Sequence, residues 1–162
     1  MSADAPVTLV MYGNYECLHC RRAHPFVQAL RAELGDRLRF VYRHFARPAD
    51  FPNAELAAEA AEAAGAQGQF WAMHDALMSG EPRLHRSALV DHAAALGLDV
   101  AAFDEALRER RYRERVRAQL AEGVERGVRS TPAFFIDGVQ HPAAWDLDAV
   151  RDAVLDEVAV RR

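Results

Sequence analysis

The sequence predicts an α/β protein in which a strand–helix–strand unit and a strand–strand–helix unit are separated by a block of helices. Residues 7–12 form a β-branched and apolar run that is typical of a buried strand. Residues 53–127 carry apolar side chains at helical spacing almost throughout. Residues 132–136 return to a short apolar run, and Asp137-Gly138 after them is a strong signal for a two-residue hairpin turn.

The first strand leads directly into a helix. Apolar side chains recur at helical spacing over residues 26–34, and Gly35 marks the end of that pattern. The only two cysteines of the chain, Cys17 and Cys20, lie between the strand and this pattern. We therefore expect Cys17 at or near the helix N-terminus and Cys20 about one turn later. Pro25, inside the helix, is expected to kink it.

A second strand is predicted over residues 39–45, where apolar and polar side chains alternate. Phe40, Tyr42 and His44 share one of its faces, so His44 is expected to be a hydrogen-bonded histidine of the core or the sheet edge. A strand, a helix and a second strand in this order imply a parallel pair with a right-handed crossover.

The helical block is predicted to hold four helices. Asn53 is the expected N-cap of the first, which ends at Gly65, and residues 69–78 form the second. Ser87 is expected to cap the third helix. Residues 99–124 are expected to form a fourth and longer helix, capped by Asp99.

Two groups of side chains in this block are expected to have structural and not functional roles. Phe70 and Trp71 are expected to belong to its core. The arginines between residues 108 and 117 are expected to form a solvated, ion-paired helix face and not a polyanion site, since acidic partners lie at helical spacing. The expected pairs are Asp104 with Arg108, Glu109 with Arg113, and Arg110 with Glu114.

A last helix is predicted from about Asp146. The complete order is that of a thioredoxin fold with an all-helical insertion. We expect residues 1–50 to form the N-terminal half with the cysteines, residues 51–127 the insertion, and residues 128–162 the C-terminal half with the strand that Pro132 opens.

Composition excludes several classes of protein. With 162 residues, 51% hydrophobic and 27% charged, the chain is expected to be one soluble globular domain. Its formal charge of -4 argues against a generic nucleic-acid binder. No stretch approaches the roughly 20 apolar residues of a membrane span, and no signal peptide is apparent. We expect a cytoplasmic location, or a periplasmic or other extracytoplasmic one if a signal was removed.

The position of the cysteine pair favours redox chemistry. A disulfide between cysteines this close would close only a short loop and would contribute little as a structural crosslink. At a helix N-terminus, free N–H groups and the helix dipole stabilise an anion, so the Cys17 thiolate is expected to be favoured. His19 adds to this effect if it is protonated or donates toward the sulfur.

Two motifs in this order around a helical block make the whole chain resemble a bacterial DsbA-like thiol-disulfide oxidoreductase of the thioredoxin superfamily. The motifs are Tyr15-Glu16-Cys17-Leu18-His19-Cys20 and Gly127-Val128-Arg129-Ser130-Thr131-Pro132-Ala133-Phe134-Phe135-Ile136-Asp137-Gly138.

The resemblance implies that Cys17 attacks, that Cys20 resolves, and that Pro132 is a cis-proline opposite them. Thr131 precedes that proline, and a histidine at the position of His19 resembles the more oxidising members. Thr131 and Leu18 are the expected substrate contacts. The implied partners are protein thiols or disulfides and a small thiol such as glutathione, with no cofactor and no metal.

Two positions depart from the family pattern. Leu18 stands where a proline often precedes the histidine, and Met11 stands where the first strand often carries a buried acid. Glu16 is expected to be exposed and is not assigned the role of that acid. Water or His24 is the candidate for proton transfer at Cys20.

Alternatives remain for the same cysteines. One is a metal-binding or redox-sensing module, with Cys17, Cys20 and His24 as the ligand set, although zinc would need a fourth ligand. Another is a glutathione-dependent transferase or isomerase on the related DsbA-like fold, which the cysteine pair disfavours because that class usually carries a serine there. The sequence leaves the direction of thiol exchange open.

Overall fold

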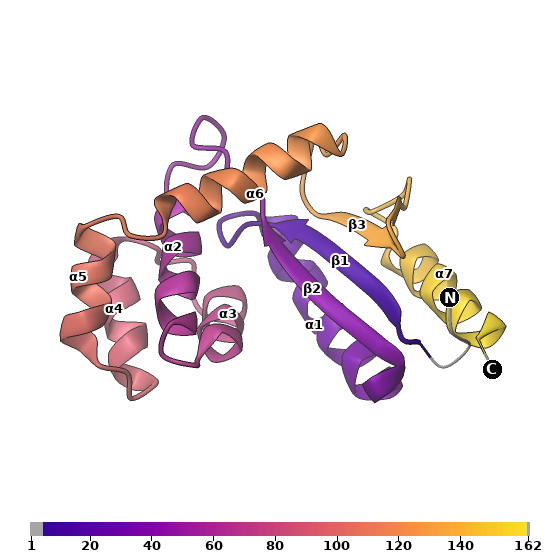
Figure 1. Cartoon of the computed structure of the whole chain (residues 1–162), viewed down its shortest axis with the longest axis horizontal. Coiled ribbons are helices and arrows are strands. Elements are labelled where there is room, and N and C mark those ends of the chain that lie inside the picture. The colour runs from indigo at the N-terminus through magenta and orange to yellow at the C-terminus, as the bar shows by residue number, and fades with distance from the viewer. Residues whose placement is uncertain (1–4, 162) are drawn as a thin grey trace.

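A computed structural model describes residues 5–161 of the chain (Figure 1). Within that range the elements, in chain order, are β1 (Val7–Gly13), α1 (Leu18–Leu34), the 3-10 helix η1 (Gly35–Arg37), β2 (Leu38–His44), α2 (Ala54–Gly65), α3 (Phe70–Ser79), α4 (Arg86–Ala95), α5 (Val100–Arg108), α6 (Arg113–Glu125), β3 (Ala133–Ile136), β4 (Val139–Gln140) and α7 (Leu147–Val160). This is the predicted α/β order with a helical insertion. Residues 1–4, which were searched for a signal peptide, lie outside the described range.

The described strands form one four-stranded sheet in the order β2-β1-β3-β4. β1 pairs in parallel with β2, as predicted, and antiparallel with β3, while β3 and β4 form an antiparallel hairpin. Asp137 and Gly138 join that hairpin with φ angles of 49° and 85°. Both angles lie in the left-handed region, which is why this dipeptide favours the turn.

The two faces of the sheet pack against different helices. Leu9 and Met11 of β1 belong to the main core, together with side chains of α1 and α7. Tyr12 points to the other face, where it packs with Phe45 and Phe135 in a smaller cluster that Leu120 of α6 borders. The alternation of side chains along a strand produces this division.

The helices α2, α3, α4 and α5 lie together beside the sheet, and α6 runs from this group across to the sheet (Figure 1). α2 is their buried centre and contacts α3, α5 and α6. Its small side chains permit close helix packing; the buried ones are Ala54, Ala57, Ala58, Ala60, Ala61, Ala63 and Ala64.

The prediction of a single long helix over residues 99–124 is wrong. α5 ends at Arg108 and α6 begins at Arg113, and Arg110 between them has φ +52°. The guanidinium of Arg110 donates to the carboxylates of Glu59 and Glu55 on α2. These tertiary ion pairs hold a conformation that helical periodicity does not reveal.

The predicted ion pairs along that helix are also mostly replaced. Arg108 does pair with Asp104, with nitrogen and oxygen 3.0 Å apart. Arg111 pairs with Glu109 beside it. The remaining partners lie on α2: Glu55 accepts from Arg110, Arg113 and Arg117, and Glu62 accepts from Arg115. The arginines thus join α6 to α2 and are not a purely solvated face.

Helix starts agree with the sequence in part. Asp99 and Asp146 cap α5 and α7, each accepting from the backbone N–H three residues later. Asn53 occupies the N-cap of α2, but its side chain donates to Glu16 instead of capping the helix. α4 begins at Arg86, so Ser87 lies inside its first turn and is not the cap.

Three further observations qualify the predictions. α1 continues through Pro25. Phe70 is half-buried, but Trp71 is 37% exposed and packs under Arg31, whose guanidinium carbon lies 4.7 Å from the ring centroid. The expectation that Trp71 belongs to the core is therefore wrong. Among residues 5–161, no helix combines the length and the apolar character that crossing a bilayer requires.

Candidate active site

A buried asparagine sets the entry of the chain into α1. The side-chain oxygen of Asn14 accepts hydrogen bonds from the backbone N–H groups of Glu16 and Cys17, at 3.0 and 2.9 Å. These bonds fold residues 14–17 into a tight turn between β1 and α1. Cys17 then occupies the N-cap position of α1, as the sequence predicted.

The two cysteines are free thiols in the structure, and both are buried. Cys17 is 3% exposed, and its sulfur lies 3.7 Å from the carbonyl oxygen of Thr131. The Thr131-Pro132 peptide bond is cis, as the resemblance implied. The structure thus places the start of α1 directly opposite the start of β3.

The surroundings of Cys17 favour its thiolate. A hydrogen bond from the Cys20 thiol is the largest influence and lowers the pKa of Cys17 to about 5, against the opposing effect of burial. A hydrogen bond with the side chain of Thr131 and the backbone N–H groups of Cys20 and His19 lower the pKa further. These N–H groups belong to the first turn of α1, where helices leave donors free.

The surroundings of Cys20 have the opposite effect. Burial, and then the interaction with Cys17, raise the pKa of Cys20 well above its ordinary value. At neutral pH the reduced pair therefore consists of a Cys17 thiolate and a Cys20 thiol. One sulfur is ready to attack while the other keeps its proton.

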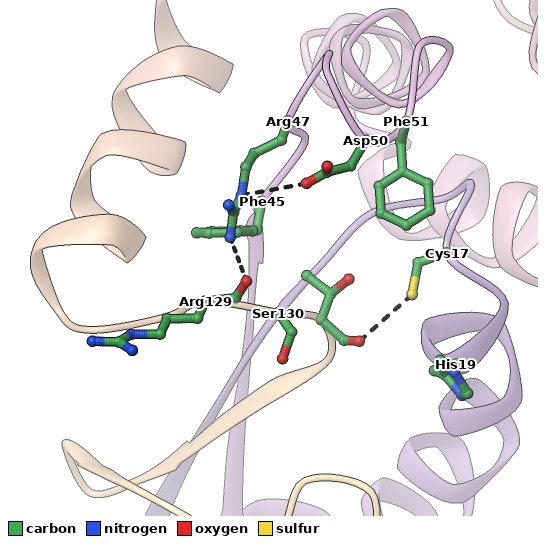
Figure 2. Close-up of a pocket in the computed structure, with 9 residues that line it drawn as sticks. Cys17, His19, Phe45, Arg47, Asp50, Phe51, Arg129 and Ser130 are labelled. Atoms are coloured by element: carbon green, nitrogen blue, oxygen red, sulfur yellow. Dashed lines mark hydrogen bonds and ion pairs between the residues drawn. The ribbon is translucent and has the colours of Figure 1, made fainter.

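Two pockets lie at this site and share His19, Ser130 and Thr131 as walls. The first, which we call the arginine pocket, has a volume of about 250 Å³ and is shown in Figure 2. Its walls are Cys17, His19, Phe45, Arg47, Asp50, Phe51, Arg129, Ser130 and Thr131. The second, the tryptophan pocket, has a volume of about 570 Å³, and its walls are His19, Arg22, Ser130, Thr131, Pro132, Ala144, Trp145 and Leu147.

The structure brings most of the predicted site residues together. His19 and Thr131 line both pockets, Cys17 lines the arginine pocket, and Pro132 lines the tryptophan pocket. Leu18 lies beside them at the start of α1 and is 56% exposed. Neither set of walls includes Leu18, so its expected role as a substrate contact stays a prediction.

Several site residues were not found from the sequence. Asn14 follows the glycine that ends β1, and this dipeptide resembles an ordinary turn. Arg47 and Arg129 reach the arginine pocket from segments far apart in the chain, and Figure 2 shows them across the pocket from Cys17. Trp145 is 84% exposed in the loop before α7, and an aromatic residue just before a capping aspartate was the one available signal.

Met11, at the position of the missing strand acid, is buried. Its register partner on β2 is Tyr42, whose buried hydroxyl has no hydrogen-bond partner among residues 5–161. A Cβ at Gly13 would lie 3.1 Å from the Cys20 sulfur and 3.2 Å from the Tyr42 hydroxyl. Gly13 thus leaves room for both groups at the end of β1. Glu16, expected to be exposed, is half-buried.

As a histidine on a helix, His24 was expected at the surface, but this prediction is wrong, because the residue is 5% exposed on the inner side of α1. It does not gather with the two cysteines. Among the described residues, the group whose potential ligand atoms all lie within 4.8 Å of one another is His24, His74 and Asp75. The ligand set suggested for the metal alternative is therefore not formed. His44 matches its prediction and pairs with Glu62 at 3.0 Å.

Comparisons with known proteins agree with this architecture. A thioredoxin-like oxidoreductase from Silicibacter pomeroyi superposes with a TM-score of 0.81 at 26% identity, over 96% of this chain and 88% of that one. α-DsbA1 from Wolbachia pipientis superposes with a TM-score of 0.79 at 17% identity, over 97% of this chain and 88% of that one. The DsbA-like fold expected from the motifs is confirmed.

A curated relative has a different kind of name. A Na(+)/H(+) antiporter NhaA 1 from Salinispora arenicola is 39% identical over 160 residues, which are 98% of this chain but 24% of the relative. The chain thus spans about a quarter of the length of the curated relatives that it matches. Residues 2–156, nearly the whole chain, match the family described as Thioredoxin, and the chain belongs to that family.

Proposed function

We propose that the chain is a dithiol-disulfide oxidoreductase that exchanges disulfides with protein or small-thiol substrates through Cys17 and Cys20. One observation carries the proposal: the pKa of Cys17 is lowered to about 5 while the pKa of Cys20 is raised, with the Cys17 sulfur beside Thr131. A nucleophile needs the first property. The raised pKa of Cys20 suits a resolving thiol, which stays protonated until the mixed disulfide has formed.

In the oxidising direction the chain begins as the Cys17–Cys20 disulfide. A substrate thiolate attacks the Cys17 sulfur, a mixed disulfide forms, and Cys20 leaves as a thiolate that takes up a proton. A second substrate thiolate then attacks the substrate sulfur of the mixed disulfide and releases the Cys17 thiolate. The substrate loses two electrons and gains a disulfide, and the cysteine pair gains the two electrons.

In the reducing direction the same steps run backward. The Cys17 thiolate attacks a substrate disulfide, and Cys20 loses its proton and attacks Cys17 to release the reduced substrate. The burial that raises the Cys20 pKa slows this last step unless a nearby group accepts the proton. Water fills this role in our proposal, since Met11 replaces the strand acid.

The remaining predicted residues take positioning roles. Pro132 and Thr131 shape the surface opposite Cys17, where backbone groups are available to an extended substrate chain. His19 and Leu18 border the same entrance. Across the arginine pocket from Cys17, Arg47 and Arg129 offer positive charge, which Asp50 offsets in part. This charge suits the carboxylates of a small anionic thiol such as glutathione.

The deciding experiment is a titration of the Cys17/Cys20 couple in glutathione buffers, with Cys20→Ser as the control that forms no intramolecular disulfide. A potential near about -120 mV makes the chain a disulfide donor suited to an extracytoplasmic compartment. A potential near about -270 mV makes it a reductase suited to the cytoplasm. If no disulfide forms at any poise, the proposal is wrong.

A second candidate is a redox-sensing module of a membrane transporter. It is favoured by the match of nearly the whole chain to a quarter of a protein named as an antiporter. Turnover separates the two functions. An oxidoreductase oxidises or reduces many equivalents of a model substrate per chain with a glutathione couple present, whereas a sensor is oxidised once and stops.

A further inference from the structure

A cluster of potential ligands lies between α1 and α3, apart from the proposed thiol chemistry. His24 comes from the inner side of α1, and His74 and Asp75 come from α3. One ligand atom from each lies within 4.8 Å of the others. The two imidazole rings meet edge to face, with centroids 5.5 Å apart. His24 and His74 are 50 positions apart in the chain, and the packing of α1 against α3 brings them together.

The Nε2 atom of His24 is the least satisfied atom of this cluster. It is buried and has no hydrogen-bond partner among residues 5–161. Asp75 Oδ1 is 3.5 Å away, which is longer than a normal hydrogen bond. Buried polar atoms in folded proteins almost always have a partner, so this nitrogen points to a missing ligand.

His74 is held in a defined orientation. Its Nδ1 lies 2.8 Å from the hydroxyl of buried Tyr15, which leaves Nε2 as the nitrogen available to a ligand. A histidine that binds a metal usually gives its other ring N–H to an acceptor, and the Tyr15 hydroxyl can be that acceptor. Tyr15 thus has the position of an outer-shell group that orients a ligand.

The third member connects the cluster to solvent. The Asp75 side chain is 47% exposed and lines a surface pocket with Gln28 and Arg31. Two guanidiniums lie near the cluster but are engaged elsewhere: Arg21 donates to the carbonyls of Leu77 and Gly80, and Arg31 covers the Trp71 ring. Asp75 is therefore the member of the cluster that an ion arriving from solvent meets first.

We propose that His24, His74 and Asp75 bind a divalent transition-metal ion of the Zn²⁺ class, with solvent as the remaining ligand. Two imidazoles and one carboxylate are ligand types that zinc takes in proteins, and an open position is compatible with three protein ligands. This site differs in place and ligands from the cysteine-based metal alternative, and it does not depend on the proposed thiol exchange.

The test is a titration of the Cys17→Ser/Cys20→Ser chain with Co²⁺, followed by competition with Zn²⁺. Removing both thiols ensures that sulfur does not bind the metal. We expect one Co²⁺ per chain, seen as visible absorption, and its displacement by Zn²⁺. Asp75→Asn and His24→Gln each weaken binding by at least about tenfold, and Tyr15→Phe weakens it by about tenfold, as loss of an outer-shell partner does.

The matched controls are His85→Gln and Asp91→Asn, which change exposed residues of the same types on or next to α4. They leave Co²⁺ binding unchanged. The proposal is overturned if the thiol-free chain binds no metal, or if Asp75→Asn binds as tightly as the parent. Asp75 is half-exposed, so this variant tests the site even if the change at buried His24 disturbs folding.

Discussion

The Cys17 sulfur lies 3.7 Å from the carbonyl oxygen of Thr131, although 114 positions separate the two residues. The sheet explains this proximity. β1 and β3 are antiparallel neighbours, and Tyr12 is the register partner of Ala133. The end of β1 therefore meets the start of β3, so the turn that leads to Cys17 faces the residues that precede β3. The geometry of the candidate site is a consequence of strand register.

The first prediction concerns the reactivity of Cys17. Because its pKa is lowered to about 5, the rate of alkylation of Cys17 by iodoacetamide will rise with pH through a midpoint near that value. An ordinary cysteine would give a midpoint near about 8.5. The measurement is the pH profile of alkylation in reduced protein, with the modified residue located by mass spectrometry. A midpoint above neutrality would contradict the thiolate assignment.

The second prediction tests the cause of that pKa. The hydrogen bond from the Cys20 thiol is the largest influence on Cys17, so Cys20→Ala will move the alkylation midpoint upward. Cys20→Ser retains an O–H donor and will move it less. Both variants keep the N-terminal N–H groups of α1. The difference between their midpoints therefore measures the contribution of the side-chain hydrogen bond at position 20 alone. Equal midpoints in all three proteins would assign the pKa to the helix terminus alone.

The third prediction is that stability depends more steeply on pH in the reduced protein than in the disulfide form. The folded-state pKa of Cys17 is lowered, so its contribution is present above the unfolded-state pKa and is lost as pH falls toward about 5. The pKa of Cys20 is raised, so its contribution is present below its unfolded-state pKa and is lost as pH rises. Guanidinium unfolding of the reduced protein will therefore show decreasing stability from pH 8 to pH 5.

The control for this measurement is Cys17→Ser, which removes the lowered pKa. Its stability over the same pH range will be flatter than that of the reduced parent. The disulfide form has no thiol to titrate and will also be flatter. A parallel loss of stability in all three proteins would place the effect in groups that they share, such as the buried histidines His24 and His74, whose pKa values are also lowered.

The elements that were predictable from sequence are those with local signals. The Asp137-Gly138 turn needs left-handed backbone that glycine and aspartate tolerate, and Asp99 and Asp146 cap helices with their own side chains. The position of Cys17 at the start of α1 likewise followed from the change of periodicity. In each case the deciding interaction involves residues within a few positions of one another.

The features that were missed depend on tertiary partners. Arginine is a good helix former, so nothing local at Arg110 indicates a break; its partners lie on α2. The burial of His24 did have a signal, since it shares a helix face with Cys20 and Val27, but histidine is usually placed at the surface. The meeting of His24 with His74 depends on how α1 packs against α3.

The fourth prediction follows from the ion pairs of Arg110. Glu59 is 1% exposed and Glu55 is 8% exposed, and Arg110 donates to both. Removing one partner of a buried ion pair leaves an uncompensated charge, so Arg110→Ala will destabilise the chain by about 3 kcal/mol. Arg108→Ala is the matched control, because the Arg108 side chain is 62% exposed and its pair with Asp104 is worth about 0.5 kcal/mol.

Both variants are compared by guanidinium unfolding at neutral pH. If Arg110→Ala costs no more than Arg108→Ala, water reaches the two carboxylates and the pair does not hold α6 against α2. A double variant Arg110→Ala/Glu59→Gln distinguishes charge from packing. It will recover part of the lost stability, since the buried charge is removed together with its partner.

The last prediction concerns Gly123, where α6 crosses the sheet. A Cβ there would lie 2.7 Å from Cδ1 of Phe45 and 3.1 Å from Cδ1 of Tyr12. Alanine gains about 1 kcal/mol of helix propensity over glycine, but forcing atoms into a packed core costs about 1–3 kcal/mol. We expect Gly123→Ala to be destabilising, with Ala118→Gly on the exposed side of α6 measuring the propensity difference alone. Adding Phe45→Leu makes room for the methyl group, so the double variant will be more stable than the sum of the single effects. If the stability changes of the two single variants simply add, a methyl group at position 123 does not clash with the Phe45 ring. The close approach of α6 to the sheet would then not explain the glycine at this position.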